Sequence, residues 1–232
     1  QHQVACGAVH TLLLCKSGKV YTCGKNEGGL LGTGLRGGPP FWGAPQLVEP
    51  LLTKQVKLVT CGTRHSAALG YDPQRKLTRV FTWGSNSHGQ LGLSGVPVDA
   101  QVLRSKVIET ITANVVDVVC GAFHTLCVTE ENKVYSWGDN RHMQLGIDSW
   151  TYQEIGGENI KLNRPVTAPK NVTFRSKNFR FQQPAESRVP SSAPTRAYQS
   201  DGEFATHPAT APHSRPRTVA FEDPIESPGR KV

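Results

Sequence analysis

An all-β repeat protein is the fold class that this sequence predicts, from two recurring motifs and the strand-like segments between them. The first motif, Cys-Gly-x-x-His, recurs 55 and then 59 residues apart, at Cys6, Cys61 and Cys120. The second, in its fullest form Trp-Gly-x-Asn-x-x-Gln-Leu-Gly, has its first glycine 60 and then 54 residues apart, at Gly24, Gly84 and Gly138. Two motifs that recur together at one long period indicate a repeat architecture with three units.

Each unit is expected to contain three recognisable strands. The first is a short apolar run, rich in β-branched residues and ended by glycine, as in Val56–Cys61 and Val115–Cys120. The second starts at the motif histidine and covers 10–15, 65–69 and 124–128. The third alternates as a half-buried strand does, over 19–23, 79–83 and 133–137. Short turns join the second strand to the third, which predicts antiparallel hairpins.

The spacing between the motifs shows where the units tolerate insertion. The motif glycines are 17 residues apart in the first and third units but 22 apart in the second, so 70–78 is expected to lengthen that hairpin. The connections at 33–44 and 147–163 vary freely. No sustained helical period occurs in residues 1–165, and 101–112 is the most helix-compatible stretch.

The composition changes near residue 169, where we place the domain boundary. Nine of the 16 prolines lie in 169–232, with few aliphatic residues between them. Such a segment cannot bury enough apolar surface to offset its ordering entropy, so we predict a disordered tail after the repeats of 1–168. The exception is 172–181, whose aromatic and basic residues have the spacing of an edge strand or docking peptide. We expect phosphorylation in the tail at Ser214, Thr218 and Ser227.

Charge and cysteines exclude several classes of protein. The net charge of +8 divides into +4 for 1–167 and +4 for 168–232, without a dense basic run, so a nucleic acid is not expected as a direct ligand. No apolar run is long enough for a membrane span. Six cysteines in a repeat protein of this size indicate free thiols and a cytoplasmic or nuclear location. Because the chain starts at Gln1 and its only methionine is Met143, we expect a piece of a longer protein.

The two motifs together resemble the regulator of chromosome condensation repeat family. The resemblance covers residues 1–168 and implies that each unit contributes to a four-stranded blade, with seven blades closing a β-propeller. The predicted fold is therefore a partial β-propeller of about three blades followed by a disordered tail. Kelch repeats, a rival at a similar period, would need double glycines in register, and those at Gly28, Gly37 and Gly156 are not.

The motif residues are expected to be structural. The glycines either adopt a positive φ or prevent a collision, the asparagines bond the backbone of a turn and tolerate left-handed geometry, and the tryptophans pack between blades. The first unit departs from the pattern, with Cys23 at the tryptophan position. The structural set is Cys6, Gly7, His10, Gly24, Asn26, Gly32, Cys61, Gly62, His65, Trp83, Gly84, Asn86, Gly92, Cys120, Gly121, His124, Trp137, Gly138, Asn140 and Gly146.

No catalytic site, cofactor or metal is expected. The chain has no recognisable nucleophile–base arrangement and no phosphate-binding loop. His10, His65 and His124 form a repeated Cys-x-x-x-His pattern, but each unit offers only two ligands where zinc requires four. Buried histidines that bond backbone groups are the favoured interpretation.

We therefore predict a non-enzymatic scaffold that binds protein partners through loops of the propeller. Exposed aromatics and a divergent turn are the candidate contacts, although the aromatics could equally cover a blade edge. The candidate residues are Phe41, Trp42, Asp139, Arg141, His142, Trp150 and Tyr152.

Two alternatives come from the resemblance. Some family members are guanine-nucleotide exchange factors for a small GTPase and dock on chromatin; the long hairpin at 70–79 is a candidate wedge, although a plain surface hairpin explains it as well. Others are modules of larger regulators such as ubiquitin ligases. A third relative, the plant ultraviolet-B photoreceptor, has Trp and Arg inside its Gly-x-x-His motifs, and the pairs that start at Ala8, Thr63 and Ala122 do not match it.

Overall fold

The computed structural model describes residues 3–35, 38–147, 150–155 and 158–173, with the backbone alone described between 150 and 163. These residues form three antiparallel sheets of four strands, one two-stranded hairpin and a 3-10 turn, η1 (Glu49–Leu51). Each four-stranded sheet corresponds to one repeat and is called a blade. Thr218, the two tail serines and most of 172–181 lie outside the described residues.

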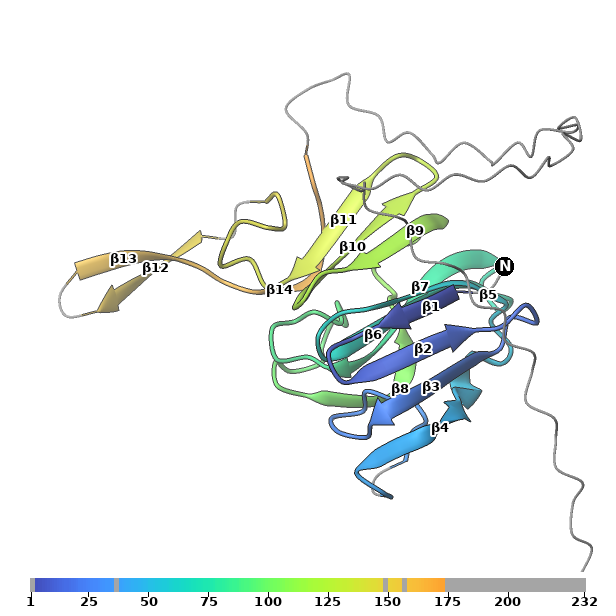
Figure 1. The fold of residues 1–232 in the computed structure, drawn as a ribbon. Coiled ribbons are helices and arrows are strands. Elements are labelled where there is room, and N and C mark those ends of the chain that lie inside the picture. The colour runs from blue at the N-terminus through green and yellow to red at the C-terminus, as the bar shows by residue number, and fades with distance from the viewer. Residues whose placement is uncertain (1–2, 36–37, 148–149, 156–157, 174–232) are drawn as a thin grey trace, which may run out of the picture.

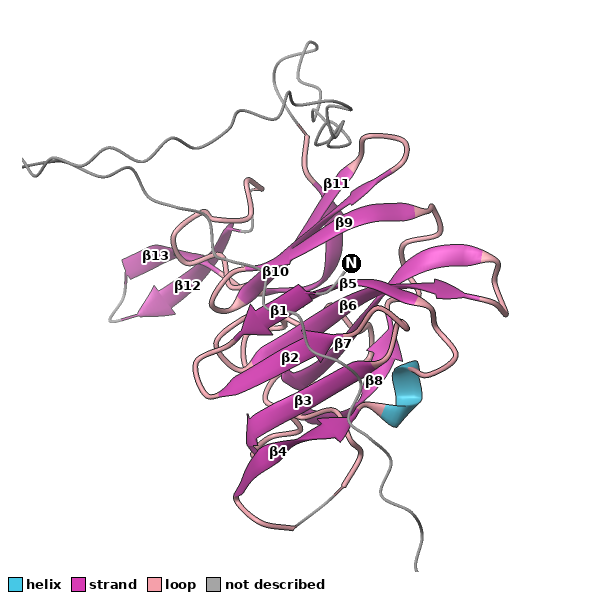
Figure 2. Cartoon of the chain, turned by 45° about the vertical axis from the view of Figure 1, so that its right-hand side comes forward, coloured by secondary structure: helices cyan, strands magenta, loops and turns pink. Residues whose placement is uncertain are grey.

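The strands of each blade are ordered from an inner to an outer edge (Figure 1). Blade 1 contains β1 (Gln3–Cys6), β2 (His10–Leu14), β3 (Val20–Lys25) and β4 (Phe41–Leu47). Blade 2 contains β5 (Val56–Cys61), β6 (His65–Asp72), β7 (Leu77–Ser85) and β8 (Gln101–Val107). Blade 3 contains β9 (Val115–Cys120), β10 (His124–Thr129), β11 (Val134–Gly138) and β14 (Val166–Asn171). The inner strands β1, β5 and β9 lie together (Figure 2), and this arrangement of successive blades is that of a partial propeller.

The outer strand of each blade is the element that the sequence did not reveal. In every blade the motif glycine pairs with an outer-strand residue, Trp42, Val102 or Val166, and the register shifts beside that pair. The stretch 101–112 therefore begins with strand β8 and not a helix. Strand β14 ends at Asn171, three residues beyond the boundary predicted at 168.

The motif glycines serve both expected purposes. Positive φ values of +116°, +102° and +108° occur at Gly24, Gly84 and Gly138. Gly62, in the first motif, instead avoids a collision: an added Cβ would lie 2.1 Å from the His65 ring and 2.6 Å from the Gly121 carbonyl oxygen of the next blade. A side chain at any of these positions would strain the backbone or separate the blades.

The motif asparagines brace the turn through its backbone, as expected. The Leu91 amide donates to Asn86 Oδ1 (3.2 Å), and Asn86 Nδ2 donates to the Pro97 carbonyl (2.9 Å). Asn140 makes the equivalent bonds in blade 3. Asparagine tolerates a left-handed backbone conformation, but the motif asparagines do not adopt it, since their φ values are not positive.

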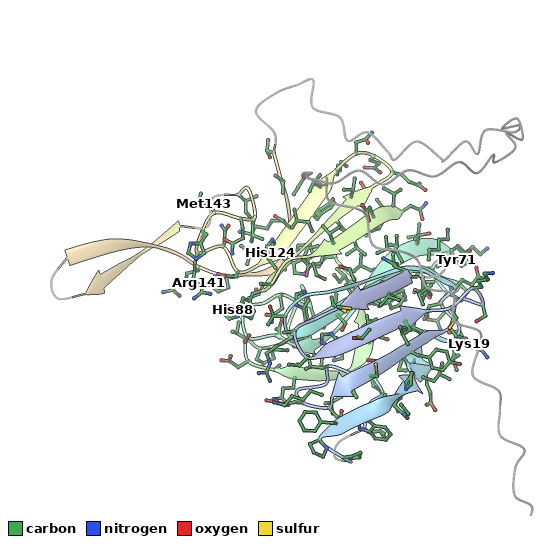
Figure 3. The ribbon with its side chains drawn as sticks, viewed as in Figure 1. Lys19, Tyr71, His88, His124, Arg141 and Met143 are labelled. Carbon is green, nitrogen blue, oxygen red and sulfur yellow. The ribbon has the colours of Figure 1, made fainter. Side chains whose placement is uncertain are left out.

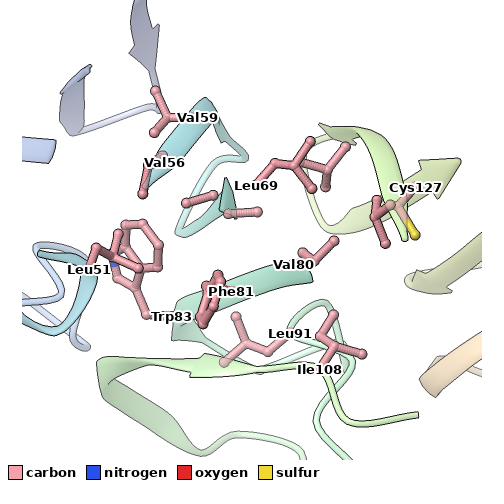
Figure 4. Packing of buried hydrophobic residues seen from close by; sticks show 14 of the residues in the cluster. Leu51, Val56, Val59, Leu69, Val80, Phe81, Trp83, Leu91, Ile108 and Cys127 are labelled. Carbon is pink, nitrogen blue, oxygen red and sulfur yellow. The ribbon is translucent and has the colours of Figure 1, made fainter. Parts of the chain in front are cut away.

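Tryptophans connect consecutive blades. Trp83 is completely buried (Figure 4), and its Nε1 donates to the Leu30 carbonyl of blade 1 (3.0 Å). Its ring covers Gly32, where an added Cβ would lie 2.7 Å from Nε1. Trp137 of blade 3 lies in the same way on the second-motif turn of blade 2. The prediction that these indoles pack between blades is confirmed.

Histidines form a second connection between blades. Nε2 of His10 lies 2.9 Å from Ser66 Oγ, and Nε2 of His65 lies 2.9 Å from Thr125 Oγ1. The expectation of backbone partners was wrong: each imidazole meets a hydroxyl of the following blade. Burial lowers the pKa of His10 to about 4 and that of His65 to about 3, so both rings are neutral at pH 7.

The long hairpin of blade 2 is held down by ion pairs. Asp72, almost completely buried, accepts from Lys54 (2.9 Å) and Arg75 (3.2 Å). Arg75 also pairs with Glu109 at 2.8 Å. Burial alone would raise the pKa of Asp72, but the hydrogen bond and charge of Lys54, together with the bonds from the Gln74 amide and Arg75, outweigh burial and hold the pKa below its usual value. A hairpin tied to the blade in this way is a poor wedge.

Replacing Asp72 with asparagine is expected to lower the free energy of unfolding by about 1 to 3 kcal/mol, because Lys54 and Arg75 lose their shared charged acceptor. Urea denaturation followed by circular dichroism measures the change. Glu131→Gln is the matched control, since Glu131 pairs with Lys133 at 2.7 Å on the exposed surface and should have no measurable effect. Equal losses of stability in the two variants would contradict the role of Asp72 as a buried acceptor for Lys54 and Arg75.

Candidate protein-binding face

The second-motif turns of all three blades lie at one end of the molecule, which we call the turn face. It is formed by 24–32, 84–92 and 138–146 together with the residues between the glycine and histidine of each first motif. Figure 3 shows His88, Arg141 and Met143 at this end and Lys19 and Tyr71 at the opposite end. The turn face is therefore separate from the end that carries the long hairpin.

Side chains of consecutive blades meet on the turn face. Arg64 of blade 2 pairs with Glu27 of blade 1 at 2.6 Å. Phe123 of blade 3 stacks on His88 of blade 2 with ring centroids 4.7 Å apart. Hydrogen bonds from Lys25 and then Arg64 lower the pKa of Glu27. Arg64 and Phe123 each stand directly before a motif histidine, and this place in the sequence was the signal that could have identified them as inter-blade contacts.

In blade 3 the turn presents an arginine held in one geometry. Arg141 Nε lies 3.0 Å from Asp139 Oδ1, and Nη2 lies 3.0 Å from Oδ2. Asp139 is buried, whereas the Arg141 side chain is 57% exposed. Burial would raise the pKa of Asp139, but the bonds from Arg141 lower it below its usual value. The carboxylate thus orients the guanidinium, and Arg141 and His142 remain accessible.

The predicted contact residues fall in separate places. Phe41 and Trp42 lie in the outer strand β4 of blade 1, where Phe41 is 66% exposed. They therefore lie in the strand at the outer edge of the blade and not in an irregular loop. Asp139 is too buried to meet a partner directly. Trp150 and Tyr152 lie in strand β12, where side chains are not described.

A two-stranded hairpin projects from blade 3 between its third and outer strands. It consists of β12 (Trp150–Ile155) and β13 (Glu158–Asn163), paired from Trp150 with Asn163 to Ile155 with Glu158. Figure 1 shows it extending away from the blades. The hairpin begins a few residues after the turn that carries Arg141, so the hairpin and this turn lie near each other (Figure 3). Residues 147–163 were predicted to be an irregular connection, which was wrong for their paired part.

The first-motif cysteines line a groove of about 320 Å³ along the inner strands. Burial raises the pKa of both Cys61 and Cys120 to about 12, so neither is poised as a thiolate. None of the six cysteines, all of which lie in the described residues, forms a disulfide. Within the described residues, no group of three or more His, Cys, Asp or Glu side chains could hold a metal ion. None of the described helical residues forms a segment that could cross a membrane.

Comparison with known families identifies the repeats. Two models described as the regulator of chromosome condensation (RCC1) repeat match residues 2–29 and 115–144, and 17–69 and 79–128. The chain belongs to the RCC1 repeat family. The matches include all three copies of the first motif and two of the second. The two longer matches each run from the third strand of one blade into the second strand of the next.

Similar RCC1-repeat proteins are much longer than the part that this chain matches. The human probable E3 ubiquitin-protein ligase HERC6 is 37% identical over 145 residues, 62% of this chain and 13% of that protein. The human E3 ubiquitin-protein ligase HERC2 is 37% identical over 152 residues, 64% of this chain and 3% of that protein. The chain therefore spans only a small part of either relative.

Solved structures support the same fold. Human WBSCR16 superposes with a TM-score of 0.57 at 28% identity, covering 75% of this chain and 41% of that one. Prp20p from Saccharomyces cerevisiae, described with its binding to Gsp1p and histones, gives 0.59 at 24% identity, covering 78% and 40%. The three blades thus have the fold of part of an RCC1-type propeller.

Proposed function

We propose that this chain is a non-enzymatic propeller module that binds a protein partner on the turn face of blade 3, beside the projecting hairpin. The observation that carries the proposal is the geometry of Arg141. An exposed guanidinium already oriented by a buried carboxylate loses little side-chain entropy when it meets a partner, and arginine is enriched among the residues that dominate binding energy. The chemistry favours a partner that brings an acidic side chain to Arg141.

The test compares two charge reversals at opposite ends of the molecule. Proteins that co-purify with the chain are quantified by mass spectrometry for the native sequence, Arg141→Glu and Lys16→Glu. Lys16 is exposed in the turn between β2 and β3, so it supplies the same change of charge away from the turn face. We expect at least one partner to fall tenfold or more with Arg141→Glu only, which corresponds to about 1.4 kcal/mol of binding free energy. If no partner distinguishes the two variants, the proposed face is wrong.

A module of a larger regulator, such as a ubiquitin ligase, is the context that we propose for this face, supported by the likeness to HERC6 and HERC2. In that context the chain recruits a partner and another part of the protein carries the chemistry. We also keep the cytoplasm or nucleus as its proposed location, because none of its six cysteines forms a disulfide.

Nucleotide exchange on a small GTPase is the second candidate function. The projecting hairpin β12–β13 is a better candidate for the wedge than the hairpin at 70–79. Hairpin β12–β13 extends away from its blade, whereas ion pairs hold the hairpin at 70–79 against blade 2. Release of a fluorescent guanine nucleotide from purified small GTPases would be compared between the native chain and a variant with 151–162 replaced by a Gly-Ser linker. Acceleration by the native chain alone would support exchange, and no acceleration of any GTPase would exclude it.

A further inference from the structure

The outer strands of the three blades share one register but differ at one position. In that register, the outer-strand residues that pair with equivalent residues of the third strand are Gln46, Lys106 and Lys170. The residues directly before them are, in blade order, Pro45, Ser105 and Pro169. Blade 2 is thus the blade that keeps a backbone N–H at this position, because proline has none.

The backbone at this position faces away from the blade. The Ile108 amide donates to the Val80 carbonyl of β7 at 3.0 Å, so the backbone groups of Ile108 face β7. Because the direction of these groups alternates along a strand, those of Ser105 and Val107 face away from β7. The equivalent bonds in blades 1 and 3 give their prolines the same orientation. Ser105 therefore presents a donor at the outer edge of blade 2.

Proline in an outer strand protects its edge against pairing with another strand, and blade 2 lacks this protection. A loop of blade 1 covers only the first half of the β8 edge, where the Gly34 amide donates to the Leu103 carbonyl at 2.9 Å. Among the residues that the structure describes, none forms a strand on the outer side of Ser105 and Val107. The second half of this edge is therefore open to an added strand.

A hollow of about 440 Å³ lies along the open half of the edge. Three consecutive residues of β8, 105–107, line it together with Leu93 and Val96 of the loop that precedes β8. Leu93 is buried and Val96 packs against the hydrophobic core, so the loop side of the hollow is apolar. An aliphatic side chain of an added strand would lose its contact with water there.

The charge beside the open edge is positive. Arg104 and Lys106 are both exposed, and neither makes an ion pair with a described residue. The carboxylate of Glu109, which also lines the hollow, is already paired with Arg75 at 2.8 Å and with Arg79 at 3.3 Å. The two unpaired cations therefore favour an added strand that carries acidic side chains.

We propose that the β8 edge at 105–107 binds an extended segment of a partner protein, which adds a further strand to blade 2. The segment places an aliphatic side chain in the hollow and an Asp or Glu beside Arg104 and Lys106. In this mode of recognition the main-chain hydrogen bonds supply affinity, and the hollow and the charges supply specificity. A second copy of this chain that paired through the same edge would bring like charges together, which disfavours it.

Selection of random linear peptides displayed on phage against the full chain tests the proposal. We expect enriched peptides that combine aliphatic and acidic residues, and fluorescence polarisation of synthetic copies measures their affinity. Ser105→Pro should weaken binding by at least about tenfold, because the edge loses its donor. This variant should fold, since proline already occupies the equivalent position in the other two blades. Ser105→Ala keeps the N–H and is the matched control, which should bind as the native chain does.

Lys106→Glu provides an independent variant, which should weaken the acidic peptides and favour copies in which Lys replaces Asp and Glu. The proposal is overturned if no peptide binds the native chain more tightly than the Ser105→Pro variant, or if the enriched peptides lack acidic residues. A dimer in light scattering that Ser105→Pro abolishes would assign the edge to a second copy instead. These peptide affinities do not involve Arg141, so this proposal and the proposed function can each fail alone.

Discussion

Trp83→Ala is expected to lower the free energy of unfolding by about 3 to 5 kcal/mol, the largest effect of any single substitution in blade 2. Trp83 is completely buried, and the substitution removes both its ring from Gly32 and its hydrogen bond to the Leu30 carbonyl. A loss of this size is a large fraction of the stability of an ordinary domain. Blade 1 would lose one of its attachments to blade 2.

Urea denaturation followed by far-ultraviolet circular dichroism measures this effect without relying on tryptophan emission. Trp83→Phe keeps most of the apolar area but leaves the Leu30 carbonyl without its donor, so a loss of about 1 to 2 kcal/mol is expected. Phe41→Ala, at a residue that is 66% exposed, is the control and should change stability little. If Trp83→Ala lowered the free energy of unfolding no more than Phe41→Ala does, the claim that Trp83 joins blades 1 and 2 would be wrong.

Acidification from pH 7 to pH 5 is expected to destabilise the fold by about 2 kcal/mol for each of His10 and His65. Their pKa values, about 4 and about 3, lie below the unfolded value of 6.5 because of burial. The unfolded chain therefore binds more protons in this range, and stability falls as pH drops below 6.5. The nearby His10 and His124 lower the pKa of His65 further.

The free energy of urea unfolding at several values between pH 7 and pH 5 provides the test. This window separates the histidines from Asp72 and Asp139, whose pKa values lie below the usual range of a carboxyl group. His65→Gln should remove about 2 kcal/mol of the pH dependence; His10 and the partly buried His124, whose pKa burial also lowers, contribute the remainder. The same substitution at His142, which is exposed on the turn face, controls for loss of a histidine. Unfolding free energies that do not change over this window would show that the imidazoles are not buried in neutral form.

Local sequence was sufficient to predict the blades and their hairpins. The motif glycines marked the ends of strands locally, because a positive φ such as that of Gly24, Gly84 and Gly138 favours glycine. The same holds for β2 and β3, whose alternation and short turn define a hairpin within one unit. Three of the four strands of blades 2 and 3 were predicted in this way, and β2 and β3 of blade 1.

Only the tertiary structure decided the rest, because the deciding contacts join residues that are distant in sequence. Strands β4, β8 and β14 share no motif; each is a strand because it pairs with the strand before it in its blade. The partners of His10 and His65 lie one blade further on, 56 and 60 residues away. The orientation of Arg141 depends on the burial of Asp139. The sequence alone therefore determined the repeated unit, whereas packing between units determined which side chains remain exposed to bind.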